Sequence, residues 1–125
     1  MYREAITHPD LPPPAGTYSP GIRAGGLVFL AGQTPRDVNN VRHGDKPFEM
    51  QERIALDNLQ CAARAAGLSL ADAVRVGVFL RDPANQSKVF DRIYAEYVGT
   101  PAPARTLVQS DLPGFDVEVD AILMG

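Results

Sequence analysis

The sequence predicts an α+β domain with the element order β-β-α-β-α-β-β, in which two helices cover one face of a mixed sheet. Two stretches carry apolar residues at three- and four-residue spacing, and five shorter runs are apolar or β-branched and lie between turn residues. The length of 125 residues and the hydrophobic share of 45% fit one domain that spans residues 1–125.

The first two strands are predicted to form a hairpin after a proline-rich lead-in. Five prolines within residues 8–20 exclude a helix there. Two runs with strand character, residues 19–24 and 27–33, flank Gly25-Gly26, and two glycines between such runs are a hairpin signal. The polar segment 34–46 that follows predicts a surface loop, and loops of this length are often mobile.

The two helices are expected over residues 48–66 and over a second segment that ends at Val98. Apolar residues recur on one side of the first helix, and Gly67 is placed to end it. Asn85 or Ser87 is expected to cap the second helix, because short polar side chains satisfy free backbone N–H groups at helix starts.

The remaining strands are predicted at residues 74–80, 105–109 and 115–123. Both 27–31 and 76–80 are apolar at nearly every position, so both faces of these strands need cover. Two helices can shield only one face of the sheet, and the other face would expose a large apolar patch. We therefore expect a homo-oligomer that packs through this second face.

Composition narrows the classes of partner and the cellular location. The formal charge of −3 and the scattered basic residues argue against nucleic acid and anionic membranes as partners. The single cysteine, Cys61, cannot form an intrachain disulfide, which favours a reducing, cytoplasmic location. No leader-like start and no apolar run of about 18 residues is present, so we expect a soluble protein that is not exported.

Several kinds of catalytic site lack support in the sequence. Gly25-Gly26 is not followed by the lysine of a phosphate-binding loop. The two histidines, His8 and His43, lie in separate loops and predict neither a metal site nor a Ser/His/Asp triad. Cys61 lies inside a predicted helix with no histidine near it in sequence, so we expect an inert thiol.

The C-terminal third holds the residues best suited to chemistry. Arg105 stands where a proline-containing loop becomes a strand, and its guanidinium can grip a carboxylate with two parallel hydrogen bonds. In the last strand, alternation sets Glu118 and Asp120 on the face opposite the apolar residues. From the residues alone, a cross-strand salt bridge between Arg105 and one of these acids is as good an explanation as a site.

Short motifs run along nearly the whole chain. In the C-terminal third they are Pro103-Ala104-Arg105, Leu112-Pro113 and Val117-Glu118-Val119-Asp120-Ala121. Before these stand Gly16-Thr17-Tyr18-Ser19-Pro20-Gly21, Leu30-Ala31-Gly32-Gln33-Thr34-Pro35, Leu56-Asp57-Asn58-Leu59 and Ala65-Ala66-Gly67-Leu68. Each motif is weak by itself, but their order and spacing together specifically resemble the RidA (YjgF) family of small imine and enamine deaminases.

The resemblance implies a homotrimer with a chorismate-mutase-like fold and one cleft at each subunit interface. It implies hydrolysis of 2-imino acids and their enamine tautomers, of the 2-aminoacrylate type, to 2-oxo acids and ammonia without a cofactor or metal. Carried over by position, Arg105 would hold the substrate carboxylate and Glu118 the attacking water. Tyr18 would line the cleft, and the backbone around Ala31 and Gly32 would contact the substrate.

Three positions depart from the family pattern. Ala31 replaces a frequent serine, Leu107 replaces a frequent cysteine, and Asp91 falls near a position where some relatives have asparagine. A cleft lined by these residues is expected to prefer a bulkier or more apolar imino acid. Ala31 and Leu107 also leave open a non-catalytic trimer that binds 2-oxo acids or other metabolites. RNA cleavage and a chaperone-like role, both attributed to some relatives, are further alternatives, and the acidic balance argues against RNA.

Overall fold

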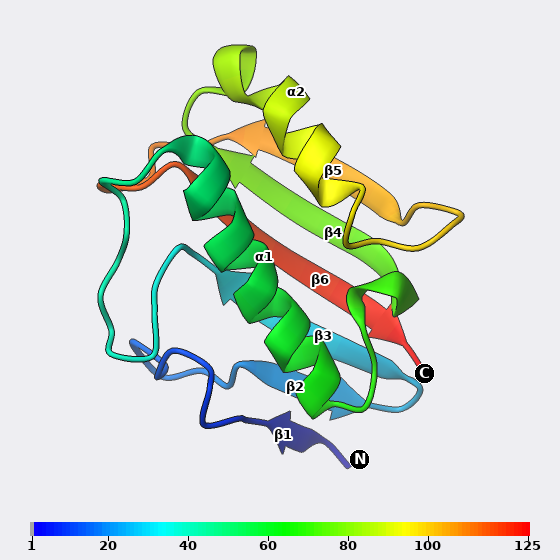
Figure 1. Cartoon of the computed structure of the whole chain (residues 1–125). Coiled ribbons are helices and arrows are strands. Elements are labelled where there is room, and N and C mark those ends of the chain that lie inside the picture. The colour runs from blue at the N-terminus through cyan, green and yellow to red at the C-terminus, as the bar shows by residue number, and fades with distance from the viewer. Residues whose placement is uncertain (1) are drawn as a thin grey trace.

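The computed structural model describes residues 2–125 and confirms the predicted α+β class, with two helices on one face of a mixed sheet (Figure 1). The strands are β1 (Glu4–Ile6), β2 (Gly21–Ala24), β3 (Leu27–Gln33), β4 (Ala73–Leu80), β5 (Ala104–Gln109) and β6 (Val117–Met124). The helices are α1 (Phe48–Ala65) and α2 (Pro83–Tyr94), and the short 3-10 turn η1 (Leu70–Asp72) precedes β4.

The last strand of the chain lies in the middle of the sheet. The strand order is β1-β2-β3-β6-β4-β5, and only β4 and β5 run parallel to each other. Strand β6 is therefore paired on both sides, with β3 and with β4. This position brings the two acids of β6 next to residues from the first and second halves of the chain.

The sheet has one strand more than the sequence predicted. Residues 4–6 pair with β2, with Ala5 opposite Ile22 and Ile6 opposite Gly21. Ile6 is buried, and a segment of three residues is too short to show an alternating pattern. The edge strand β1 therefore depends on a tertiary contact that the local sequence does not reveal.

The second helix begins earlier and ends earlier than predicted. Pro83 is its first residue, where the fixed φ of proline suits a helix start, and Asp82 precedes it. Neither expected cap is correct: Asn85 donates its side-chain amide to Asp82 Oδ2 at 2.7 Å, and the Ser87 hydroxyl donates to the Pro83 carbonyl at 2.7 Å. The helix ends at Tyr94 rather than at Val98.

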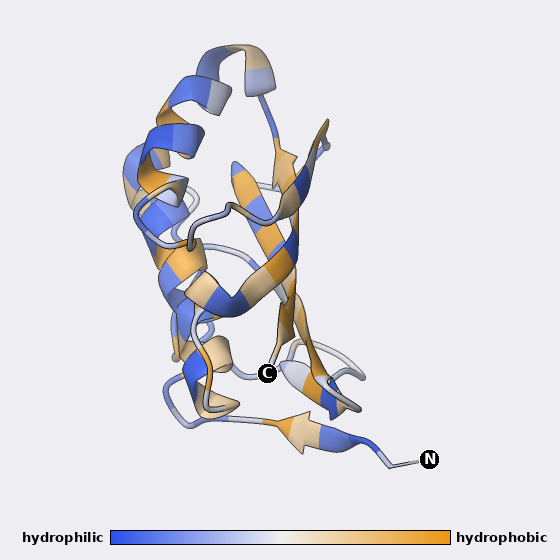
Figure 2. Ribbon diagram, turned by 90° about the vertical axis from the view of Figure 1, so that its right-hand side faces the viewer, coloured by the Kyte–Doolittle hydropathy of each residue, from blue (hydrophilic) through white to orange (hydrophobic). Residues whose placement is uncertain are grey.

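The hydrophobic core fills the space between the helices and the sheet. Figure 2 shows both helices on the same side of the strands. The inward side chains of β4 and β6 are almost fully buried and pack with those of the helices, including Val76, Val78, Leu80, Val117, Val119, Leu56, Leu59 and Phe90. Neither helix is long and apolar enough to cross a membrane, among the residues described.

The other face of the sheet carries no helix (Figure 2), and some of its apolar residues are exposed. Phe29 on β3 is 41% exposed and Val108 on β5 is 42% exposed. Phe29 lies between the buried Val28 and Leu30, as the two-faced apolar character of 27–31 predicts, and Val108 follows the half-buried Leu107. An apolar sheet face of this kind is typical of an interaction surface.

Candidate functional site

A pocket of about 480 Å³ opens at the end of β3, beside the start of β6. Strand residues Ala31, Gly32 and Glu118 form one wall, and Tyr18 reaches it from the proline-rich lead-in. The segments 34–42 and 112–115 complete it. We call this cavity the Glu118 pocket. It brings together four of the residues that the sequence singled out.

A bulge in β3 shapes the wall of this pocket. Leu30 pairs with Ala121 and Gln33 pairs with Val119, so β3 carries one more residue than β6 across this interval. The extra length falls at Ala31 and Gly32. Bulges of this kind bend a strand and redirect its side chains, and they recur beside active sites.

The Glu118 carboxyl is half-buried on the face of the sheet that the helices do not cover. Its strand neighbours Val117 and Val119 are fully buried on the helix side. Burial raises the pKa of Glu118, the nearby charge of Asp120 raises that pKa further, and Arg42 lowers it. A carboxyl with a raised pKa is suited to taking up and returning a proton near neutral pH.

Asp120 has a structural partner on the same face. Its Oδ1 accepts the backbone N–H of Gly77 at 3.0 Å. Gly77 has no side chain to obstruct this contact, because a Cβ there would come within 2.4 Å of the same oxygen. This hydrogen bond supports a structural role for Asp120.

Tyr18 is fixed at the mouth of the Glu118 pocket by its hydroxyl. The Tyr18 oxygen accepts the backbone N–H of Ala15 at 3.1 Å and a guanidinium N–H of Arg36 at 3.4 Å. Arg36 also donates to Asn40 Oδ1 at 2.7 Å. The lead-in and the segment after β3 are thereby tied together at the pocket.

Segment 34–46 has a defined turn rather than the open loop that its polar composition suggested. Asn40 adopts a positive φ of 65°, and the Asp37 N–H donates to the Val41 carbonyl at 2.9 Å. An isolated bridge pairs Arg36 with Arg42 across this turn. Both arginines line the Glu118 pocket, and neither was singled out from the sequence.

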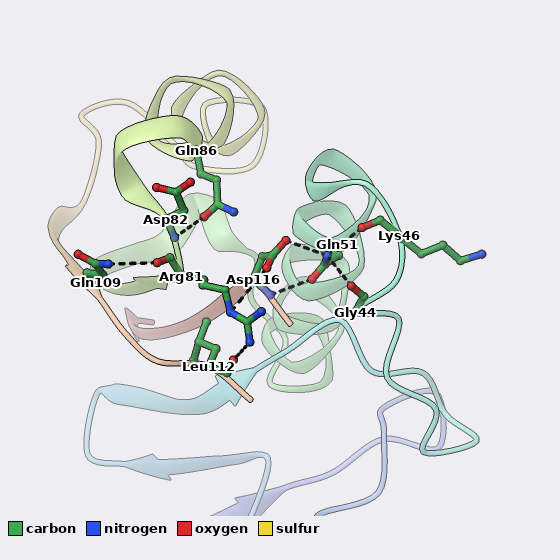
Figure 3. A network of polar contacts seen from close by, with 9 residues as sticks. All are labelled: Gly44, Lys46, Gln51, Arg81, Asp82, Gln86, Gln109, Leu112 and Asp116. Atoms are coloured by element: carbon green, nitrogen blue, oxygen red, sulfur yellow. Dashed lines mark hydrogen bonds and ion pairs between the residues drawn. The ribbon is translucent and has the colours of Figure 1, made fainter. Parts of the chain in front are cut away.

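A buried glutamine joins this segment to the loop before β6 (Figure 3). The Gln51 amide nitrogen donates to the carbonyls of Gly44 and Lys46 and to Asp116 Oδ2, at 3.3, 2.9 and 3.1 Å. Its oxygen accepts the Asp116 N–H at 2.9 Å. Arg81 extends the network to the Leu112 carbonyl and to Asp116 (Figure 3). These contacts hold both outer walls of the pocket.

Arg105 lies in a different place. Its guanidinium forms an ion pair with Asp91 of α2 at 2.8 Å and lies over the Tyr94 ring, 4.9 Å from the ring centroid. Leu107, two residues further along β5, points to the same face and packs against the core. We call Asp91, Arg105 and Leu107 the Arg105 cluster.

The two groups of predicted site residues face opposite sides of the sheet. Arg105 pairs in register with Val76, whose side chain is buried on the helix face. Glu118 pairs with Phe79, on the face without helices. The cross-strand salt bridge between Arg105 and Glu118 or Asp120 that the sequence allowed is wrong, because α2 packs over β5 and supplies Asp91 instead.

Cys61 has a histidine neighbour that sequence separation concealed. Its Sγ lies 3.8 Å from His8 Nδ1, and that nitrogen accepts the Asp10 N–H at 3.1 Å. Burial raises the pKa of the Cys61 thiol, and Asp10 raises it further. A thiol held in its protonated form is a poor nucleophile, which agrees with the expected inert cysteine.

No group of three metal-ligating side chains is found within residues 2–125.

Comparison with known proteins identifies the family. The family model for endoribonuclease L-PSP matches residues 9–124. A RutC family protein of Pyrococcus horikoshii is 39% identical over 124 residues, which cover 96% of each chain. A 2-iminobutanoate/2-iminopropanoate deaminase of Dermatophagoides farinae is 28% identical over 124 residues, which cover 98% of this chain and 96% of that protein.

The fold agrees with that of solved structures. The crystal structure of RidA from an Antarctic Psychrobacter superposes with a TM-score of 0.89 at 30% identity, over 98% of this chain and 99% of that one. The motifs, the fold and the match over nearly the whole chain agree with one another. The chain therefore belongs to the endoribonuclease L-PSP family, the RidA/YjgF family.

Proposed function

We propose that this chain is a cofactor-independent deaminase that hydrolyses reactive 2-imino acids and their enamine tautomers, of the 2-aminoacrylate type, to 2-oxo acids and ammonia. One observation carries the proposal: the chain presents two complementary halves of such a site, and neither half is sufficient alone. The Glu118 pocket supplies a carboxyl with a raised pKa, and the Arg105 cluster supplies a carboxylate receptor. The name of the Dermatophagoides relative supports this reaction class.

The two halves meet only if subunits assemble. They face opposite sides of one sheet, so the Glu118 pocket of one subunit must receive the Arg105 cluster of its neighbour. An interface that joins two different surfaces repeats head to tail, and it closes into a ring when the rotation between neighbouring subunits divides a full turn. A homotrimer with three equivalent clefts satisfies this requirement, and the exposed apolar face with Phe29 and Val108 supplies a surface to bury.

In the proposed reaction, Arg105 holds the substrate carboxylate with two charge-assisted hydrogen bonds. The ionised Glu118 accepts a proton from water as the water oxygen adds to the carbon of the protonated imine, which gives a neutral tetrahedral aminol. The carboxyl then returns this proton to the amino nitrogen and the C–N bond breaks as ammonia leaves. The hydroxyl proton passes to the Glu118 carboxylate as the carbon–oxygen double bond forms, and ammonia takes it up as ammonium. Positioning and proton transfer suffice because the imine carbon is already electrophilic, and general acid-base help contributes about 10²- to 10⁴-fold.

The other predicted residues shape the cleft. Tyr18 closes one side of the Glu118 pocket, and the backbone around Ala31 and Gly32 would contact the ligand. In the Arg105 cluster, Asp91 already forms an ion pair with the Arg105 guanidinium. A substrate carboxylate therefore has to share the guanidinium with Asp91 or displace Asp91 from it. Leu107 adds an apolar contact beside this anchor.

The test generates imino acids in situ with an amino-acid oxidase and traps them with semicarbazide. An active deaminase lowers semicarbazone formation, and Glu118→Gln and Arg105→Gln are expected to lose this effect. Glu49→Gln, which neutralises an exposed glutamate on α1, is the matched control. If the wild-type chain never competes, under conditions in which a known deaminase does, the proposal is refuted.

A non-catalytic metabolite-binding trimer is the second candidate. Ala31 and Leu107 favour it, because they place apolar groups where the family often has a serine and a cysteine. Calorimetry with 2-oxo acids separates the two functions. A binding protein takes up the 2-oxo acid without accelerating hydrolysis of the corresponding imine.

A further inference from the structure

We propose that the Glu118 pocket receives a second anionic group of the ligand, held by Arg36 and Arg42. This inference rests on the proposed function: the preferred substrate is then a 2-imino acid with an acidic side chain. Arg105 of the neighbouring subunit would hold the carboxylate next to the imine, and the pair of arginines would hold the distal carboxylate.

Arg36 is a buried cation without a counter-ion. The residue is only 8% exposed, and within residues 2–125 no carboxylate lies within ion-pair distance of its guanidinium. Its side-chain hydrogen bonds go to neutral oxygens, of Asn40 and of Tyr18. A buried charge is costly unless an opposite charge compensates it, and a guanidinium has five donor hydrogens. Arg36 is one of the residues that line the Glu118 pocket, so an anion bound there would lie beside this cation.

Arg42 places a second cation beside the first. The bridge between Arg36 and Arg42 sets their side chains on the same face of the turn. Like charges directly opposite each other in an antiparallel pair are destabilising. The Arg42 guanidinium lies 4.4 Å from the centroid of the Phe115 ring, at the pocket wall. Within residues 2–125 neither arginine has a carboxylate at ion-pair distance, so this turn is suited to binding an anion.

Other acids near the turn do not neutralise these cations. Asp37, the acid next to Arg36 in sequence, pairs instead with His43 at 2.9 Å. Glu118 is the acid that lines the pocket, and its carboxyl is not within ion-pair distance of either arginine. The pocket thus has a positive excess on a chain whose formal charge is −3.

The two anchoring sites differ in whether a carboxylate of the chain already pairs with their arginines. Arg105 already has Asp91 as a partner, whereas Arg36 and Arg42 have no carboxylate partner within residues 2–125. A volume of about 480 Å³ is ample for a small dicarboxylate. An acidic side chain therefore gains more in this pocket than an apolar side chain of the same length.

The binding test compares 2-oxoglutarate with 2-oxopentanoate, which has the same carbon chain without the distal carboxylate. Calorimetry on the assembled protein is expected to show at least about tenfold tighter binding of 2-oxoglutarate, the effect of one good charge-assisted contact. The ratio of the two affinities should fall toward one in Arg42→Gln and in Arg36→Gln. Arg42 is exposed, so its variant remains informative if the buried Arg36 variant fails to fold. Arg64→Gln, an exposed arginine on α1, is the control.

Equal affinities in the wild-type chain, or a preference that persists in both variants, would overturn the inference. The semicarbazide competition with imines made from glutamate and from norvaline separates it from the proposed function. If both imines are hydrolysed with no preference for the acidic one, the deaminase stands and the second anion site is refuted. If 2-oxoglutarate is preferred through Arg42 but neither imine is hydrolysed, the anion site stands and the deaminase is refuted.

Discussion

The carboxylate of Glu118 lies directly against the Cα of Gly32 on the neighbouring strand, so closely that a Cβ at Gly32 would be 2.3 Å from Glu118 Oε2. The φ of Gly32 is not in the left-handed region. The position needs glycine because of this close approach. The bulge in β3 and the absence of a side chain together decide where the Glu118 carboxyl can lie.

Gly32→Ala should therefore displace Glu118 and impair catalysis more than folding. We expect kcat/KM for imine hydrolysis to fall about tenfold to hundredfold, since a misplacement of about 1 Å can cost 10²-fold. Semicarbazide competition measures the rate, and thermal unfolding checks the fold. Gly26→Ala, where an added Cβ meets nothing within 4 Å, is the control. Full activity in Gly32→Ala would contradict the role given to this contact.

The Gln51 network offers a test of how the pocket walls are held. Gln51→Leu removes four hydrogen bonds and leaves polar groups of Gly44, Lys46 and Asp116 without partners. These hydrogen bonds are part-buried, and a typical one contributes about 0.5–1.5 kcal/mol, so we expect a loss of roughly 2–4 kcal/mol in the free energy of unfolding. Denaturant titration measures it. Gln109→Leu, which alters an exposed glutamine with one long hydrogen bond, should change it by less than about 1 kcal/mol.

The ion pair between Asp91 and Arg105 is expected to weaken carboxylate binding in the wild-type chain. The Asp91 side chain is 66% exposed, and exposed pairs contribute about 0.2–1 kcal/mol. Asp91→Asn should leave folding stability nearly unchanged and tighten 2-oxo acid binding by up to about fivefold. Calorimetry is the measurement. Weaker binding in this variant would show that Asp91 helps to orient Arg105 rather than competing with its ligand.

Much of the fold could be predicted because its signals are local. The amphipathic pattern located α1, Gly25-Gly26 located the hairpin, and alternation in β6 separated Glu118 from the buried valines. Strand β1 could not be predicted because three residues show no pattern. The start of α2 had a signal in Pro83, but a preference for polar caps further along the chain outweighed it.

The site was predicted less completely, because its geometry depends on long-range packing. The partner of Arg105 is set by where α2 lies over β5, which no local pattern encodes. Arg36 and Arg42 become neighbours only through the turn at Asn40. Two arginines separated by a polar turn are a usable signal, which the polar composition of segment 34–46 hides. Ala31 and Leu107 led to the expectation of a bulkier or more apolar substrate, whereas Arg36 and Arg42 favour an acidic one, and the comparison of 2-oxoglutarate with 2-oxopentanoate decides between them.

The stability of the chain should fall as pH rises, because of a buried glutamate that the proposed reaction does not use. Glu52 on α1 is 0% exposed, and neither carboxyl oxygen has a hydrogen-bond partner. Burial, opposed by Arg53 and Arg92, raises the pKa of Glu52 from 4.5 to about 9. Below about pH 4.5 the group is protonated whether the chain is folded or unfolded, so it contributes no pH dependence there.

Between about pH 4.5 and 9 the unfolded chain releases this proton while the folded chain keeps it. The free energy of unfolding then falls, by at most about 1.4 kcal/mol per pH unit. Glu52→Gln retains the neutral shape and should remove this slope, so the variant is expected to match the wild type near pH 5 and exceed it at pH 8. Denaturant titrations across this range measure the slope, with Glu49→Gln as an exposed control on the same helix. Identical slopes for wild type and Glu52→Gln would mean that Glu52 ionises in the folded chain, and that water or a neighbouring subunit solvates it.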